Sequence, residues 1–193
     1  ENFLKRKAWI KRSKKLVIKQ GRKPVGTKTA FKIKDEQDGS RRFKTRIVTK
    51  GFNMIPGQDY TESFSPVAHD MSIRFIFAMS LYIMNAKKRC ARLFQKISDE
   101  PHLPLEADDW TIEVYDVEAA FLNADPGTKM YIEVPEAMVK LDMMSEQEAA
   151  ETCFELAKSM YGNVDAALRF FIKFKSIMID IGCAQSKVDP CAF

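Results

Sequence analysis

The chain has 193 residues, of which 46% are hydrophobic and 30% are charged, a composition typical of a globular protein with an apolar core. It contains no run of 18 uncharged apolar residues, which excludes a transmembrane helix, and its first residue is not Met, so we expect the middle of a longer polypeptide. The four cysteines form no Cys-x-x-Cys pair and the two histidines have no partner at ligand spacing, so neither a zinc site nor a disulfide framework is expected.

The positive charge is concentrated at the start of the chain. Residues 1–50 carry 18 Lys and Arg against 4 acidic residues, a net charge of +14, whereas residues 51–193 carry 13 against 22, a net charge of −9. Such asymmetry predicts a basic face for a polyanion. For residues 1–23 alone, two interpretations remain open: a nucleic-acid contact or a solvated, disordered basic leader. We therefore divide the chain into a leader of residues 1–23 and a domain of residues 24–193.

A β-hairpin is predicted over residues 28–50. Basic and less polar residues alternate over 28–34, Asp38-Gly39 is a turn signal, and residues 42–50 return as a second strand. Because strand side chains repeat every two residues, Arg42, Lys44 and Arg46 share one face. This face is either a solvated cationic surface or a ligand for a triphosphate or a nucleic-acid backbone.

The next elements are a loop, a helix and a second loop. Gly and Pro mark residues 51–69 as loop, and apolar residues at helical spacing predict a helix from Asp70 or Ser72 to about residue 90. The apolar stripe of that helix is interpreted as core. Residues 99–110 contain two prolines and several acids, which indicates a surface loop.

Asp116 is the single most informative residue. It ends an apolar strand predicted over residues 111–117, and a short helix pattern over 118–123 follows at once. A carboxylate held at the end of a strand suits a hard cation such as Mg²⁺. The alternative is that Asp116 caps the helix, and the residues alone leave both interpretations open.

The remaining pattern completes an α+β fold. It predicts strands over 129–134 and 153–156, and a capping box at Ser145 with Glu148. It also predicts a helix from Asp165 to Ile181 that Gly182 ends.

Taken in order, a series of short runs resembles the reverse transcriptase domain of copia-type long-terminal-repeat retrotransposons. Any one run is weak, but their joint order over residues 25–193 is specific. The runs are Phe31-Lys32-Ile33-Lys34, Phe43 to Phe52, Gly57 to Val67, Asp116 to Asn123, Met130-Tyr131-Ile132, Tyr161-Gly162 and Asp189 to Phe193.

The resemblance implies reverse-transcriptase-like fingers and part of a palm, truncated before the Tyr-x-Asp-Asp hairpin that carries the second and third catalytic aspartates. Asp116 corresponds to the first catalytic aspartate, which binds both Mg²⁺ ions, and the Val117 carbonyl corresponds to a further metal ligand. Phe121 corresponds to the steric gate that excludes a ribose 2′-hydroxyl.

The resemblance also assigns the cations. Lys44 and Arg46 correspond to residues that hold the phosphates of the incoming nucleotide, and Arg42, Lys50 and Gly162 are expected to contact nucleic acid. The implied partners are an RNA or DNA template-primer, deoxynucleoside triphosphates and the rest of the polyprotein, namely the rest of the palm, thumb and RNase H. No membrane partner is expected, and the implied location is a cytoplasmic virus-like particle.

The sequence departs from the family pattern at two places that matter. Asp165 stands where the family has Gln, which places a negative charge near phosphates, and residues 86–109 resemble an insertion. No Tyr-x-Asp-Asp occurs in the sequence, so we expect the isolated chain to be an inactive fragment of an RNA-directed DNA polymerase. The alternatives are a non-catalytic nucleic-acid-binding remnant of a degenerate element, or an unrelated domain whose basic leader is only a tail.

Overall fold

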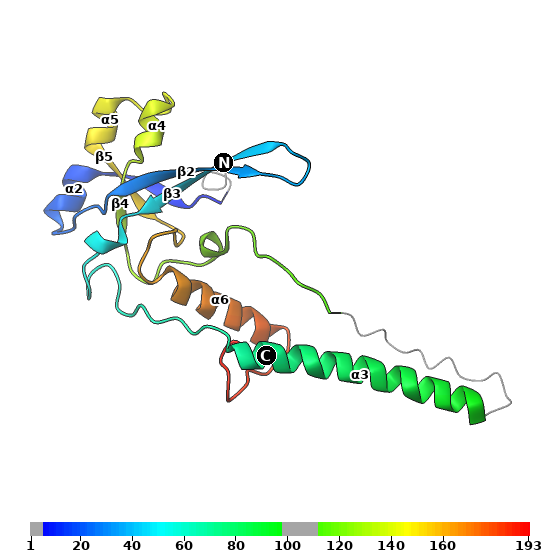
Figure 1. The fold of residues 1–193 in the computed structure, drawn as a ribbon. Coiled ribbons are helices and arrows are strands. Elements are labelled where there is room, and N and C mark those ends of the chain that lie inside the picture. The colour runs from blue at the N-terminus through cyan, green and yellow to red at the C-terminus, as the bar shows by residue number, and fades with distance from the viewer. Residues whose placement is uncertain (1–5, 98–111) are drawn as a thin grey trace. The chain divides into compact units, whose positions relative to one another are not determined.

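The computed structural model describes residues 6–97 and 112–193, and the chain divides into two compact units (Figure 1). The first unit comprises residues 1–65 and 118–181, and the second comprises residues 66–117 and 182–193. Helices and strands are mixed in the described residues, which confirms the predicted α+β class.

A three-stranded antiparallel sheet forms the centre of the first unit. Its order is β1 (Trp9–Ser13), β5 (Thr152–Leu156) and β4 (Tyr131–Glu133). The strands predicted over 129–134 and 153–156 are therefore confirmed, the first of them shortened. Val25 extends this sheet through a parallel bridge to Ile132. The sheet thus joins segments from three distant parts of the sequence.

The expectation of a disordered leader is wrong for residues 9–19. These residues form β1 and the helix α2 (Lys14–Lys19). The ring of Trp9 stacks on Phe154 with centroids 5.0 Å apart, and Ala8 and Val17 are buried. The segment has no clear period of its own because the strand that orders it, β5, lies about 140 residues further along the chain.

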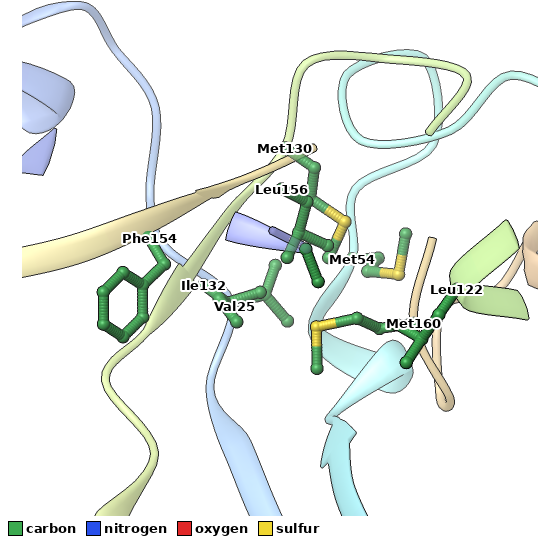
Figure 2. Packing of buried hydrophobic residues seen from close by; sticks show 9 residues of the cluster. Val25, Met54, Leu122, Met130, Ile132, Phe154, Leu156 and Met160 are labelled. Carbon is green, nitrogen blue, oxygen red and sulfur yellow. The ribbon is translucent and has the colours of Figure 1, made fainter. Parts of the chain in front are cut away.

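Methionine and aliphatic side chains make up the core of the first unit (Figure 2). Met130, Ile132 and Met160 are fully buried, and each contributes about 1.5–3 kcal/mol relative to an exposed position. The other buried members of this cluster are Ala8, Val25, Met54, Leu122, Phe154 and Leu156. The cluster joins η2, β4 and β5 to the segments just before β1 and β2 and just after η1, and so it positions the elements around the candidate site.

The predicted hairpin is confirmed. Strands β2 (Thr27–Asp35) and β3 (Arg41–Thr49) pair antiparallel, with Lys32 opposite Lys44 and Lys34 opposite Arg42. In the turn, Gly39 adopts a φ of +79°, as the turn signal requires.

Short helices and one longer helix complete the first unit. They are the 3₁₀ helices η1 (Gly51–Asn53) and η2 (Ala120–Asn123), and the α-helices α4 (Glu136–Lys140), α5 (Glu146–Glu151) and α6 (Ala166–Asp180). The Ser145 hydroxyl accepts a hydrogen bond from the Glu148 amide at 3.2 Å, which confirms the predicted N-cap of α5. Gly182 follows α6 with a φ of +93°, as its predicted role as a C-terminal stop requires.

The second unit contains α3 (Asp70–Ile97), which starts where predicted and is longer than expected. The carboxylate of Asp189 accepts hydrogen bonds from the backbone amides of His69 at 2.8 Å and Cys191 at 2.9 Å. These bonds, the His69 amide first, lower the pKa of Asp189. They tie the segment before α3 to the end of the chain. The predicted loop over residues 99–110 lies outside the described residues, as does the second half, 98–109, of the insertion over 86–109.

Residues 112–117 do not form the predicted strand. Their apolar side chains face solvent, with Val114 85% and Tyr115 81% exposed. A strand requires a paired neighbour, and among the described residues no strand pairs with this segment. The prediction of a strand is therefore wrong for residues 112–117, because composition gives a tendency and a strand also needs a neighbour to pair with.

Candidate nucleotide and nucleic-acid site

One face of the β2–β3 hairpin carries only basic side chains and two small apolar ones. The antiparallel register places side chains of even number on this face, which we call the hairpin cationic face. Its cations are Lys28, Lys32, Lys34, Arg42, Lys44 and Arg46. Lys44 is half-buried and Arg46 is exposed, and near the turn Arg42 pairs with Glu36 at 3.0 Å. Like charges opposed across two strands destabilise the pair unless an anion screens them, so this face suits a polyanion.

The base of the hairpin is fixed to the turn at Tyr161-Gly162. The Thr49 amide donates to the Tyr161 carbonyl at 2.9 Å, and the buried Thr49 hydroxyl bonds the Asn163 side-chain oxygen at 2.7 Å. Gly162 has a φ of +91°, and an added Cβ would overlap the Thr49 backbone. A Cβ on Gly51 would likewise overlap the Gly162 carbonyl. Only glycine at these two positions lets the backbones approach so closely. Gly162 is therefore required by the fold, apart from the nucleic-acid contact expected for it.

Two of the expected nucleotide ligands are brought together by this junction. The ring of Phe121 meets Tyr161 edge to face, with centroids 4.9 Å apart, and the Arg46 guanidinium lies 5.9 Å from the Tyr161 ring centroid. Both distances are within the range of attractive aromatic and cation–π contacts. Phe121 is half-buried and is not a member of the core cluster, whereas the next residue, Leu122, is.

The negative charge of Asp165 is neutralised locally. Asp165 stands at the N-cap position of α6, but its carboxylate makes no capping hydrogen bond to the helix backbone. The carboxylate instead accepts a hydrogen bond from the Arg169 guanidinium at 2.8 Å. Asp165 is 3% exposed, and the Arg169 guanidinium occupies the space where a Cβ on Gly127 would lie. The acid that departs from the family pattern is therefore paired and enclosed.

Asp116 and Val117 lie in the second unit and are exposed. The residue that precedes η2 is Ala119, with a left-handed φ of +50°, so the alternative in which Asp116 caps this helix is wrong. In the part of the chain that the structure describes, no group of three or more His, Cys, Asp or Glu side chains could hold a metal ion. One carboxylate and one carbonyl do not by themselves satisfy the oxygen coordination of Mg²⁺, so these residues do not form a complete metal site.

The side chain of Lys50 is exposed and runs past Gly26, and its charge contributes after Lys140 to lowering the pKa of Glu136. The nucleic-acid contact expected for Lys50 stays a prediction.

Four cations of the leader contact other parts of the protein. Arg6 donates to the Asn123 side chain, Lys11 pairs with Glu148, Arg12 with Glu155 at 2.6 Å and Lys14 with Glu133 at 3.4 Å. Partial burial raises the pKa of Glu155, but the hydrogen bond and charge of Arg12, with the charge of Lys129, outweigh it and hold that pKa below its usual value. These cations hold the sheet to its surroundings.

Sequence reasoning missed Tyr161, Thr49, Asn163 and Arg169 as members of the site. Arg169 could have been found, because a base four residues after Asp165 on a predicted helix lies on the same face. Thr49 and Asn163 could not, because their bond joins residues 114 positions apart.

Comparison with known proteins agrees with the ordered motifs. Residues 13–87 match the family model of the reverse transcriptase (RNA-dependent DNA polymerase). The retrovirus-related Pol polyprotein from transposon TNT 1-94 of Nicotiana tabacum is 29% identical over 177 residues, which cover 91% of this chain and 11% of that protein. Those from transposons RE2 and RE1 of Arabidopsis thaliana are each 26% identical over 170 residues, 88% of this chain and 10% of theirs.

No solved structure matches the chain. The chain spans about a tenth of the length of the curated relatives it matches. Among the described residues, no helix has both the length and the apolar character needed to cross a membrane. The similarity to the Pol polyproteins runs through nearly the whole chain, and the family match covers the hairpin and the start of α3. The predicted resemblance to the reverse transcriptases of retrotransposon Pol polyproteins is thereby confirmed.

Proposed function

We propose that this chain is the fingers and the first part of the palm of an RNA-directed DNA polymerase. The complete enzyme transfers deoxynucleotidyl groups to a primer 3′-hydroxyl on an RNA or DNA template, within the rest of the Pol polyprotein. The proposed setting is a cytoplasmic particle. The chain alone binds nucleic acid and does not polymerise.

The observation that carries the proposal is the junction of Phe121, Tyr161 and Arg46 beneath the hairpin cationic face. A ring that excludes the 2′-hydroxyl and a cation that holds phosphates must act on the same nucleotide. In the first unit, the Phe121 ring and the Arg46 guanidinium both contact the ring of Tyr161. Phe121 is half-buried, which leaves part of its ring for a substrate, as a gate requires and a core residue does not.

Asp116 takes the role of a catalytic carboxylate in this proposal, with the Val117 carbonyl beside it. The exposed apolar side chains of residues 112–117 support it, because they resemble a palm strand that lacks its neighbours. The further carboxylates and the pairing strands then come from residues that continue the polyprotein. Two Mg²⁺ ions in the complete site supply charge stabilisation for phosphoryl transfer, and this chain contributes only Asp116 and Val117 to hold them.

The test compares ribonucleotide with deoxynucleotide incorporation by the chain extended with the residues that follow it in its gene. Phe121→Ala opens space for a 2′-hydroxyl, so the efficiency of ribonucleotide use relative to deoxynucleotide use should rise about tenfold or more. The 193-residue chain without extension should give no primer extension, because one carboxylate cannot hold two Mg²⁺ ions.

Leu122→Ala is the matched control, since Leu122 is the adjacent residue and is 2% exposed. It should lower the free energy of unfolding by about 2–5 kcal/mol and leave the nucleotide ratio unchanged. If Phe121→Ala behaves like Leu122→Ala, Phe121 is core and the gate assignment is wrong. An extended protein that binds template-primer but never extends it would identify a non-catalytic remnant.

A further inference from the structure

Tyr161 occupies a position that none of the assigned residues explains. Its backbone carbonyl accepts the Thr49 amide at the end of β3, so its ring is held at the base of the hairpin. That ring contacts Phe121 at 4.9 Å and Arg46 at 5.9 Å. It is half-buried, and among the described residues its hydroxyl has no hydrogen-bond partner. A structural tyrosine of this unit, Tyr131, is 5% exposed.

We infer that Tyr161 is a positioning residue for the incoming nucleotide, which sets the gate ring of Phe121 and the phosphate-binding guanidinium of Arg46 relative to each other. This inference rests on the proposed polymerase function. Neither Phe121 nor Arg46 is held by the apolar core, since both side chains are partly or wholly exposed. The Tyr161 ring is the one described aromatic group that contacts both of them.

The physical reason is that both contacts use the same ring. An edge-to-face contact orients Phe121, and the negative face of the Tyr161 ring attracts the Arg46 cation. The backbone that carries the ring is held to the end of β3, because the Thr49 amide donates to the Tyr161 carbonyl and Gly162 packs against the Thr49 backbone. Sugar selection and phosphate binding are linked through this one side chain.

The inference predicts which kinetic quantity changes. Tyr161→Leu removes the aromatic ring and should raise the apparent Kd for dTTP roughly fivefold, the value of one cation–π and one aromatic contact, with little change in the maximal rate. It should also increase the use of UTP relative to dTTP, in the same direction as Phe121→Ala. Tyr161→Phe keeps the ring and should restore both values to within about twofold of the wild type.

The experiment is single-nucleotide incorporation of dTTP and UTP by the chain extended with its downstream residues. Tyr131→Leu is the matched control, because Lys129 lies over the Tyr131 ring at the same 5.9 Å but away from Phe121. That variant should lose stability without changing the apparent Kd. Arg46→Gln is a second variant at an exposed site. Adding Tyr161→Leu to Arg46→Gln should raise the apparent Kd for dTTP by a smaller factor than Tyr161→Leu raises it in the wild type.

The outcomes separate the two proposals. If the wild-type protein incorporates nucleotides and Tyr161→Leu leaves the apparent Kd and the nucleotide ratio unchanged, the inference is wrong and the polymerase proposal stands. The inference is equally wrong if Tyr161→Leu and Tyr131→Leu have the same effects, or if the Arg46 and Tyr161 defects are fully additive. If the wild-type protein incorporates neither nucleotide, the polymerase proposal is wrong and there is nothing for Tyr161 to position.

Discussion

The leader and the hairpin are both rich in Lys and Arg, yet they use their charge differently. In the leader, Lys11, Arg12 and Lys14 each pair with a glutamate of β4, β5 or α5. At the tip of the hairpin, Arg41 pairs with Asp35 at 3.4 Å and Arg42 with Glu36 at 3.0 Å. Lys28, Lys32 and Lys34 are exposed on the strands behind that tip.

This difference shows that the net charge of a segment does not tell how many of its cations can bind an anionic partner. The net charge of +14 over residues 1–50 combines cations that neutralise the acidic remainder of the chain with cations that do not. The charge of a paired cation is partly balanced by its glutamate, which a phosphate would have to displace. We therefore propose that nucleic acid binds to the hairpin cationic face rather than to these paired cations of the leader.

The difference between the leader and the hairpin should have its largest effect on the free energy of unfolding. Trp9→Ala removes the ring that stacks on Phe154 and should lower the free energy of unfolding by about 3 kcal/mol. Phe43→Ala in the hairpin is the matched aromatic control, and because Phe43 is 76% exposed it should change that free energy by less than about 0.5 kcal/mol. Urea unfolding of the 193-residue chain measures both. Equal losses would mean that the hairpin is as much a part of the folded core as the leader.

A smaller effect is expected on nucleic-acid binding. Replacing Lys28, Lys32 and Lys34 by Gln should weaken binding to a DNA duplex and reduce the slope of log K against log salt by about 2–3, since each lost phosphate contact removes about 0.9. Fluorescence anisotropy titrations between about 50 and 200 mM KCl measure this slope.

The control for binding is the triple replacement of Lys11, Arg12 and Lys14 by Gln, which removes the same number of charges from the leader. Its salt slope should stay close to that of the wild type, while its stability falls. If the leader variant loses as much slope as the hairpin variant, the leader cations exchange their glutamates for phosphates and the division fails.

The smallest effect is a pH dependence of stability centred on Glu155. The pKa of Glu155 is lowered in the folded protein, so its stabilising contribution is present above its unfolded pKa and is lost as the pH falls through the folded pKa. Glu155→Gln should therefore cost about 1 kcal/mol at neutral pH and nothing below about pH 3.

Glu136→Gln serves as the comparison for Glu155, because Glu136 pairs with Lys140 at 2.6 Å but both side chains are at least 70% exposed. Exposed pairs contribute little, so thermal melts of this variant should follow the wild type across the pH range. A Glu155→Gln variant with the same pH profile as the wild type would show that the Arg12 pair is not stabilising.

The sequence predicted the parts of the fold that depend on local patterns. Asp38-Gly39 and the flanking alternation predicted the hairpin and its cationic face correctly, and Ser145 with Glu148 predicted the start of α5. Prediction failed where the partner is remote or lacking. The order of Trp9–Ser13 depends on β5, and residues 112–117 have the composition of a strand without a described neighbour to pair with.

In the candidate site, too, the features that depend on remote contacts could not be predicted from the sequence. The family resemblance named Phe121 and Arg46, but their connection through Tyr161 is a tertiary contact that no local spacing encodes. The roles assigned to Phe121, Arg46, Lys44, Asp116 and Val117, and the nucleic-acid contacts, remain predictions.

The enclosed pair of Asp165 and Arg169 constrains the order in which this region can change. A Gln at position 165 would leave the Arg169 guanidinium, which lies over Gly127, without its counter-charge, and any larger residue at 127 would displace that guanidinium from Asp165. Replacing Asp165 by a neutral residue is therefore less favourable while Arg169 is present. Positions 127, 165 and 169 are thus coupled in their effect on stability, and the cost of a double substitution at 165 and 169 should be smaller than the sum of the two single costs.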